Sequence, residues 1–413
     1  MKCEIIAVGS ELLTPWRQDT NSLALTRMLN QIGVSVAFKT IVGDRRNHLV
    51  SAIRTALARA DILIVMGGLG PTEDDLSREA VAEALDLTLR RDNALIAALS
   101  IRFAGRPMTD NNLKQADLIE GATVLPNANG TAPGQWLDTG FAGHRKLVML
   151  VPGPPGECLP LFAEQCIPRL REIIPLRHIA HRTLKATFIP ESTADALLAP
   201  IYSTFTDVET TILAGNCEIQ LQLTCSKPSL EAAQQRVDTL ASRLEEALEE
   251  HLFSSTGETL EQIVLFYLEL KQETLAVAES CTGGLLAQRI TSVSGSSRSF
   301  LGGAIVYSDA LKTAFCAVPP ALLEQHGAVS APIAEALAQG IRQRTGASLG
   351  VAITGIAGPG GGSEEKPVGR VYVALSDAHR TQSEECNFRG DRDRIRLWAT
   401  QKALDMLRRR LMA

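Results

Sequence analysis

The sequence predicts an α/β protein in three parts: an α/β domain over residues 1–172, a small α+β module over 173–251 and a second α/β domain over 252–413. In the first and last parts, apolar runs of strand length alternate with segments of helical periodicity. This rhythm is typical of mostly parallel sheets with right-handed crossovers. The middle part follows the order β-α-β-β-α instead. A chain of 413 residues, 45% of them hydrophobic, can bury several cores.

The predicted elements are short and follow in a simple order. The first part is expected to contain strands at 4–8, 35–42, 61–66 and 146–151, and helices at 21–32 and 48–59. The middle part is expected to contain a strand at 182–189, a helix at 192–202, a hairpin of 210–214 and 218–225 around Gly215-Asn216, and an amphipathic helix at 229–250. The last part is expected to contain a helix at 259–271, strands at 274–278, 302–306, 349–354 and 369–375, and a terminal helix at 392–409.

Composition and charge exclude several classes of protein. A net charge of −5 argues against a protein that mainly coats nucleic acid or an anionic membrane, and 4% aromatic residues are few for base stacking. No apolar run approaches the roughly 18 residues of a membrane span. The eight cysteines form no C-x-x-C pair, so we expect reduced thiols in a cytoplasmic protein. His178 and His181 have the spacing of one helical turn, and we interpret them as a surface pair.

The segment from Ala276 to Ala287 carries the strongest chemical signal. An apolar strand enters the turn Glu279-Ser280-Cys281-Thr282-Gly283-Gly284, and a helix follows at once. Such a turn presents free backbone N–H groups and the positive end of a helix dipole. Ser280 could therefore be a nucleophile whose oxyanion those N–H groups stabilise. The alternative is that Ser280 or Thr282 caps the helix, as Ser and Thr commonly do.

Two further segments supply candidate partners for Ser280. Tyr307 and Lys312 lie in one short polar stretch after a strand, and a lysine assisted by a tyrosine hydroxyl can serve as the base where no histidine is near. The alternative is that Lys312 is a solvated surface charge. The glycine-rich stretch 354–362 leaves another strand and suits close approach to a phosphate or ribose, or else is a plain surface turn. No G-x-S-x-G, S-x-x-K, Walker A or G-x-G-x-x-G motif accompanies them.

Taken together, the last part resembles the C-terminal domain of the CinA family (competence/damage-inducible protein A). The resemblance rests on six collinear motifs: ESCTGG, VYSDALK, HGAVS, TGIAGPGGG, KPVG and FRGDRDRIR. It implies deamidation of nicotinamide mononucleotide to nicotinate mononucleotide and ammonia, without a cofactor. The catalytic residues it implies are Ser280, Tyr307 and Lys312. The substrate-binding residues it implies are Thr282, Gly283, Gly284, Thr354, Gly355, Gly358 and an arginine, Arg392 or Arg394. The family usually reads YSNEAK where this chain has YSDALK.

The first part resembles the molybdopterin-binding-like domain of the same family. The motifs that carry the resemblance are GSELL, DTN, GGLGPTEDD, NGTAPG and PGPPGE. It implies metal-assisted binding and cleavage of ADP-ribose, with a nucleotide site of Glu11, Asn21, Gly67, Gly68, Gly70, Thr72, Asn129 and Gly130 and with Asp74 and Asp75 on a divalent cation. The alternative for the acidic pair is an ordinary helix start. Pro15-Trp16-Arg17 stands where the family usually has glycine.

The middle part resembles a KH-type fold, but it lacks the G-x-x-G loop that clamps RNA. We therefore expect small-molecule nucleotides as partners, namely nicotinamide mononucleotide and ADP-ribose, and neither nucleic acid nor membrane. A homodimer is expected because two-fold dimers are the commonest assembly. The main alternative is a scaffold protein that binds a nucleotide or pterin without turnover. A nucleic-acid module is a third reading, against which the charge balance counts.

Overall fold

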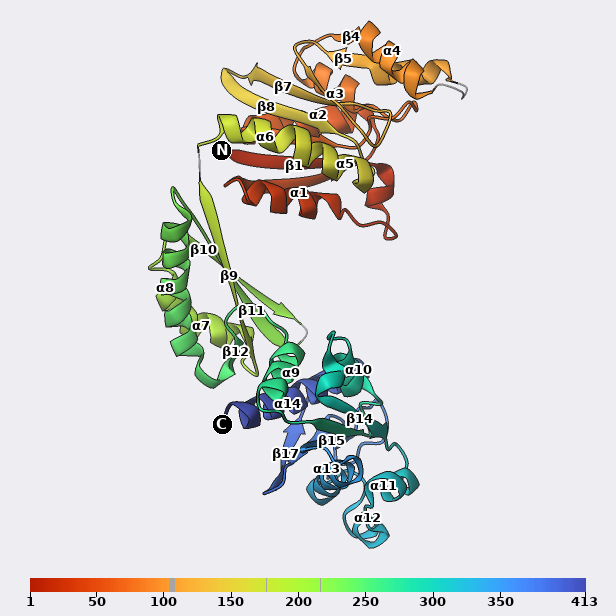
Figure 1. Ribbon diagram of the computed structural model, residues 1–413, viewed down its shortest axis with the longest axis vertical. Helices are drawn as coiled ribbons and strands as arrows, with labels where there is room; N and C mark the ends of the chain where they lie inside the picture. Colours follow the sequence, from red (N-terminus) through yellow and green to blue (C-terminus); the bar gives the residue numbers. More distant parts are fainter. Residues whose placement is uncertain (104–107, 176, 216) are drawn as a thin grey trace. The chain divides into compact units, whose positions relative to one another are not determined.

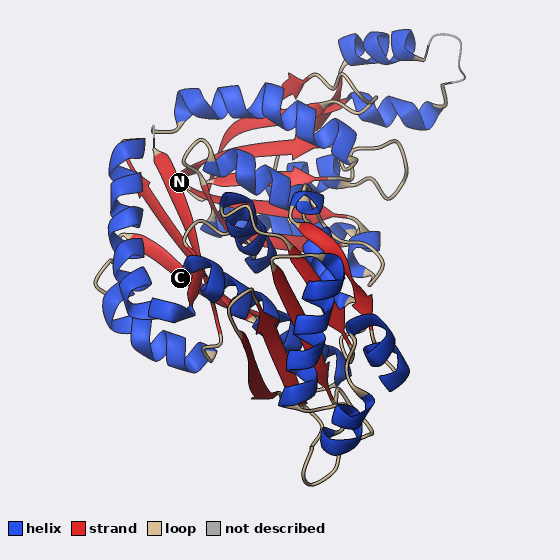
Figure 2. Cartoon of the chain, turned by 60° about the horizontal axis from the view of Figure 1, so that its bottom comes forward, coloured by secondary structure: helices blue, strands red, loops and turns tan. Residues whose placement is uncertain are grey.

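The computed structural model describes residues 1–103, 108–175, 177–215 and 217–413. The chain divides into two compact units, residues 1–180 with 226–234 and residues 181–225 with 235–413. The α/β class is confirmed, and the strands and helices can be followed in Figure 2. Asn216, at the tip of the predicted hairpin, lies outside the described residues. Among the described helices, none combines the length and the apolar character needed to cross a bilayer.

A six-stranded sheet forms the centre of the N-terminal part, in the order β2-β1-β3-β8-β7-β6. Its first four strands are parallel, as predicted, and the last two are antiparallel and were not predicted. The bounds are β1 Lys2–Val8, β2 Ser35–Val42, β3 Ile62–Met66, β6 Thr123–Leu125, β7 Gly134–Phe141 and β8 His144–Val151. Leu89–Arg91 (β4) and Asp117–Ile119 (β5) make a separate two-stranded sheet.

Helices cover both faces of this sheet because successive residues of a buried strand point to opposite sides. Ile5 packs in the core under α1, α5 and α6, and Ile6 packs in the core under α2 and α3. The bounds are α1 Asn21–Asn30, α2 Arg46–Arg59, α3 Ser77–Ala84, α4 Asn93–Arg102, α5 Pro155–Leu161 and α6 Ile167–Ile173. Shorter helical turns are η1 Ser10–Leu13, η2 Asp110–Ala116 and η3 Phe162–Cys166.

The middle module has a four-stranded sheet in the order β10-β11-β9-β12. Its elements are β9 His178–Thr187, α7 Glu191–Tyr202, β10 Val208–Gly215, β11 Glu218–Lys227, α8 Leu230–Leu248, η4 Glu249–His251 and β12 Leu252–Ser254. β12 pairs with β9, so the sheet continues past the domain boundary expected at residue 251. His178 and His181 lie on β9, where a spacing of three puts side chains on opposite faces, so the helical-turn premise for them was wrong.

The C-terminal sheet runs β14-β13-β15-β16-β17, with β14, β13 and β15 parallel and the last two antiparallel. Helices α9, α10 and α14 pack on one face and α11, α12 and α13 on the other (Figure 1). The strands are β13 Leu275–Glu279, β14 Phe300–Ile305, β15 Leu349–Gly355, β16 Arg370–Ser376 and β17 Thr381–Asn387. The helices are α9 Leu260–Leu270, α10 Leu285–Thr291, η5 Ser296–Arg298, α11 Asp309–Cys316, α12 Pro320–His326, α13 Ala331–Thr345 and α14 Arg392–Met412.

Candidate functional site

Ser280 directly follows β13, between the ends of two neighbouring parallel strands. Its backbone N–H donates to the carbonyl oxygen of Ile353 on β15 at 3.0 Å. On the other side, the N–H of Val306, just after β14, donates to the carbonyl oxygen of Glu279 at 2.8 Å. The carboxyl ends of parallel strands meet at one edge of a sheet, which is where ligands of α/β folds bind. The three segments singled out in the sequence therefore converge at this edge.

The buried carboxylate of Glu279 caps helix α10. It accepts hydrogen bonds from the backbone N–H groups of Gly284, Leu286 and Ala287 at 3.1, 3.0 and 2.8 Å. The alternative reading, in which Ser280 or Thr282 caps the helix, was therefore wrong, because a carboxylate already holds these donors. Within the described residues, the Ser280 hydroxyl makes no hydrogen bond, and that of Thr282 is buried without a partner. Because Glu279 holds the donors of α10, the Ser280 hydroxyl is not needed as a cap.

The turn after Ser280 keeps only some of its N–H groups free. Gly283 donates to the carbonyl oxygen of Ser280, and Gly284 donates to the Glu279 carboxylate. In the described part of the chain, the N–H groups of Cys281 and Thr282 have no acceptor. Both glycines adopt positive φ, 60° and 94°, which is a steric reason for glycine there. The oxyanion donors that this turn can offer are thus the N–H groups of Cys281 and Thr282.

Cys281 is adjacent to Ser280, but its environment disfavours reaction at sulfur. Burial raises the pKa of the Cys281 thiol to about 12. A buried thiol with such a pKa stays protonated near neutral pH, and the thiolate is the nucleophilic form. Ser280 is therefore the better candidate nucleophile of the pair.

Lys312 is a buried residue on the inner side of α11. Its side chain is 2% exposed, and Nζ donates to the carbonyl oxygen of Tyr307 at 3.3 Å and to Asp309 Oδ1 at 3.2 Å. The alternative of a solvated surface charge was wrong for this lysine. The ring of Tyr307 is exposed, so the two side chains present one buried amine and one accessible hydroxyl close to the end of β14.

Three arginines at the start of α14 reach different places. Arg392 donates to the Tyr307 hydroxyl at 3.2 Å and to the carbonyl oxygen of Gly358 at 2.8 Å, so it joins two of the predicted segments. Arg396 donates to the carbonyl oxygen of Thr282 at 2.7 Å and braces the turn after Ser280. Arg394 lines a separate cavity. Sequence reasoning missed Arg396, although its spacing of four from Arg392 puts both on one helical face.

The glycine-rich stretch begins at Thr354, which is buried and whose hydroxyl donates to the carbonyl oxygen of Ala328 at 2.7 Å. A Cβ on Gly355 would approach Val371 Cγ2 to 2.7 Å, and one on Gly358 would approach Val368 Cγ1 to 2.6 Å. Close packing therefore explains both glycines. The carbonyl oxygen of Gly358 accepts a hydrogen bond from Arg392, so the glycine-rich stretch borders the candidate site.

A second candidate site is a cavity of about 400 Å³ at the ends of β1, β3 and β8. Of the residues predicted there, those that line it are Glu11, Gly67, Gly68, Gly70, Thr72, Asp74 and Asp75. The other three, Asn21, Asn129 and Gly130, do not line the cavity and contact the loop around residues 153–157. Asn21 donates to the carbonyl oxygen of Gly153 at 2.7 Å, Asn129 donates to that of Gly156 at 2.8 Å, and a Cβ on Gly130 would lie 1.7 Å from Glu157.

Two basic residues support this loop, and their role was not predicted from the sequence. Arg78 is buried beneath the glycines and donates twice to the carbonyl oxygen of Leu69, at 2.8 and 2.9 Å. Lys114 donates to the carbonyl oxygen of Thr72 at 3.1 Å. The N–H and hydroxyl groups of Thr72 donate to Asp75 Oδ2 at 2.9 and 2.5 Å. The neighbouring polar groups, Thr72 first, and the Lys114 ammonium hold the pKa of the Asp74 carboxyl below its usual range.

Acidic side chains are prominent in the lining of this cavity. Its lining contains five carboxylates, from Glu11, Asp44, Asp74, Asp75 and Glu157. In the described residues, no three His, Cys, Asp or Glu side chains gather closely enough to hold a metal by themselves. Mg²⁺ is commonly bound by one or two carboxylates together with substrate phosphates, which is the arrangement that Asp74 and Asp75 would allow.

Comparison with known protein families matches each part of the chain. Residues 257–411 match the model of the CinA C-terminal domain, residues 4–172 that of a probable molybdopterin binding domain, and residues 181–254 that of the damage-inducible protein CinA KH domain.

The chain is also similar to individual relatives and to solved structures. A CinA-like protein of Acidobacterium capsulatum is 61% identical over the whole of both chains. A putative competence-damage inducible protein of Moorella thermoacetica is 43% identical over 100% of this chain and 99% of its own. The crystal structure of the competence/damage inducible protein CihA from Agrobacterium tumefaciens is 35% identical, with a TM-score of 0.36, over 39% of this chain and 100% of that chain.

Proposed function

The chain belongs to the CinA family, and on this premise we propose that its C-terminal domain hydrolyses nicotinamide mononucleotide to nicotinate mononucleotide and ammonia. The observation that carries the proposal is the Glu279 cap, which leaves the Ser280 hydroxyl and the N–H groups of Cys281 and Thr282 free at the same turn. A nucleophile beside oxyanion donors is the arrangement that acyl transfer requires.

The residues act in a simple sequence under this proposal. Ser280 Oγ attacks the carboxamide carbon, which the electron-poor pyridinium ring activates, while its proton passes to the Lys312 amine in its uncharged form with the help of the Tyr307 hydroxyl. The N–H groups of Cys281 and Thr282 stabilise the oxyanion. A proton returns to the leaving nitrogen, ammonia departs, and water then hydrolyses the nicotinoyl ester. Arg392, which donates to the Tyr307 hydroxyl, would bind the phosphate.

Ammonia release from nicotinamide mononucleotide tests the proposal. We expect one ammonia per nicotinate mononucleotide formed by the full chain, and a loss on the order of a thousandfold or more in Ser280→Ala. Lys312→Ala should lose nearly as much, and the double variant little more, because nucleophile and base act as one unit. Ser292→Ala, an exposed serine after α10, is the matched control. Near-normal turnover in Ser280→Ala, or no ammonia from the parent chain, would overturn the proposal.

We propose metal-dependent cleavage of ADP-ribose as a second activity, in the N-terminal cavity. The five carboxylates that line it support the need for a cation, since a pyrophosphate placed among them would otherwise be repelled. A divalent cation held by Asp74 and Asp75 would neutralise the phosphate oxygens. The N–H groups of Gly68, Leu69 and Gly70, in the loop that Arg78 supports, would bind the remaining oxygens.

We further propose that the chain acts on free nucleotides as a homodimer. Large apolar side chains stand exposed on and after the edge strand β14, namely Leu301, Ile305, Tyr307, Leu311 and Phe315. An exposed apolar group of this kind is typical of an interface between protein chains.

A further inference from the structure

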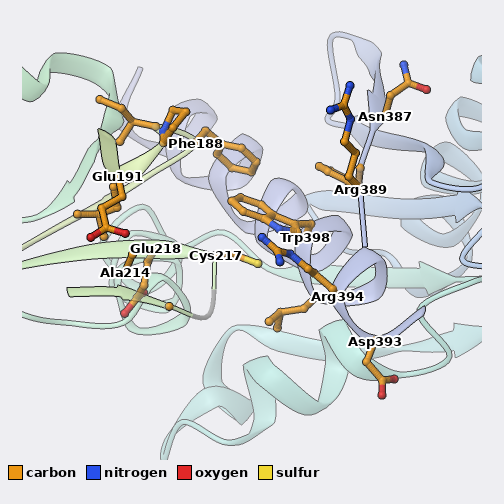
Figure 3. A pocket seen from close by; sticks show the side chains of 16 residues that line it. Phe188, Glu191, Ala214, Cys217, Glu218, Asn387, Arg389, Asp393, Arg394 and Trp398 are labelled. Carbon is orange, nitrogen blue, oxygen red and sulfur yellow. The ribbon is translucent and has the colours of Figure 1, made fainter. Parts of the chain in front are cut away.

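The C-terminal unit contains a second cavity, which the proposed reactions do not use. Its volume is about 950 Å³, and it lies between the strand ends of the middle module and the start of α14 (Figure 3). Sites for small organic ligands commonly have volumes of this order. The residues that line it come from both parts of the unit and do not include Ser280, Tyr307 or Lys312.

Aromatic rings form one wall of this cavity. The indole of Trp398 lies 6.1 Å from the ring of Phe388, nearly parallel at 16°, and 5.4 Å from the ring of Phe188. Phe188 adopts φ of 57°, a conformation rare for a bulky residue. Such strain persists where the surroundings require a particular side-chain position, and it gathers at ligand sites. Here the strained backbone of Phe188 holds its ring beside Trp398.

Charged groups complete the lining. Within the described residues, the Arg394 side chain has no ion pair or hydrogen bond, and Figure 3 shows its guanidinium beside the Trp398 ring. Glu191 and Glu218 lie together on the opposite side (Figure 3). Glu218 pairs with Lys185 at 3.2 Å, whereas Glu191 has no partner among the described residues. The cavity thus offers a flat apolar surface, a free carboxylate and, within the described residues, two guanidinium groups without a partner, those of Arg394 and Arg389.

We propose that this cavity binds a nucleoside monophosphate. The base stacks on Trp398 and Phe188, as bases do on aromatic side chains. The phosphate pairs with Arg394, whose guanidinium can donate two parallel hydrogen bonds to phosphate oxygens. The Glu191 carboxylate accepts hydrogen bonds from ribose hydroxyls. Arg394 is two residues from Arg392 on α14, so a ligand here contacts the same first helical turn that carries an arginine of the Ser280 site.

Fluorescence of Trp398 tests the proposal, and variants of Arg394 and Arg392 separate this cavity from the Ser280 site. The chain has three tryptophans, so Trp16→Phe with Trp136→Phe leaves Trp398 as the single emitter in an otherwise complete protein. Adenosine monophosphate is the probe, with adenosine and ribose 5-phosphate as its two halves. Circular dichroism checks that the double variant folds. Arg394→Gln is compared with Arg392→Gln, which removes a guanidinium from the same helix turn but on the side of Tyr307.

We expect saturable quenching by adenosine monophosphate and weaker effects of both halves. Arg394→Gln should raise the dissociation constant about tenfold or more, the scale of one charge-assisted pair, and Arg392→Gln should leave it nearly unchanged. Absence of saturable quenching at millimolar probe would overturn the proposal. So would equal weakening in the two arginine variants, or adenosine binding as tightly as its monophosphate.

Discussion

At the residue scale, the turn after β13 assigns helix capping and the candidate nucleophile to two different residues, whereas the sequence allowed Ser280 either role. Glu279 holds the start of α10, and Ser280 is left free for chemistry. The same separation explains why a serine beside a glycine pair need not be a cap. The carboxylate is 1% exposed, and its three N–H donors would be without an acceptor if it were removed.

Substitution of these two neighbours should therefore give opposite effects. Glu279→Ala should lower the free energy of unfolding by about 1–3 kcal/mol, because buried donors lose their acceptor. Ser280→Ala should change it by no more than about 0.5 kcal/mol, because this hydroxyl has no partner to lose. Urea unfolding of both variants measures the difference. A larger loss in Ser280→Ala would show that the serine, and not the carboxylate, holds the helix.

At the element scale, helix α14 joins the candidate site to the rest of the C-terminal sheet. Its first turns carry Arg392 and Arg396, and its last turns carry Arg410, which donates to Asp377 at 2.7 Å at the end of β16. Burial of Asp377 raises its pKa, but the hydrogen bonds from Arg410 and from the N–H groups of Arg380 and His379 outweigh this and lower the pKa well below its ordinary value of 3.8.

This contact predicts a pH dependence of stability. A carboxyl whose folded pKa lies below its unfolded pKa stabilises the fold above about pH 4, and the stabilisation is lost as the pH falls through the folded value. Asp377→Asn should thus lower the melting temperature at pH 7 and lower it clearly less near pH 2, because the stabilisation falls away only as the pH approaches the folded pKa. Melting curves of the parent and the variant at the two pH values measure this. An equal loss at both would show that the carboxylate charge contributes nothing.

The sequence predicted those elements whose residues are apolar on the buried side. The parallel strands β1, β3, β13 and β15 were predicted because their runs are almost wholly buried. β17 was missed because Thr381–Asn387 is mostly polar, as an edge strand with an exposed face can be. Arg78 and Arg396 were missed because their roles depend on carbonyl oxygens of other segments, which no local pattern reveals. The motifs located the Ser280 edge, and only the folded chain showed which groups there are free.

At the scale of the whole molecule, the two candidate sites stand on separate cores. Asp75→Ala should therefore abolish metal-dependent cleavage of ADP-ribose and leave ammonia release from nicotinamide mononucleotide unchanged. Both activities can be measured on one preparation, with Asp86→Ala, an acidic residue outside the cavity lining, as the control. Full pyrophosphatase activity in Asp75→Ala would show that Asp74 and Asp75 are only an ordinary helix start and bind no catalytic cation.

The proposed deamidation depends on a covalent bond between Ser280 and its substrate. Rapid acid quenching of the full chain during turnover of nicotinamide mononucleotide, followed by peptide mass spectrometry, tests it most directly. We predict a nicotinoyl ester on the peptide that contains Ser280, assigned to its side-chain oxygen and absent from Ser280→Ala. Ammonia release at a normal rate with no ester on Ser280, or with the ester on another residue, would contradict the claim.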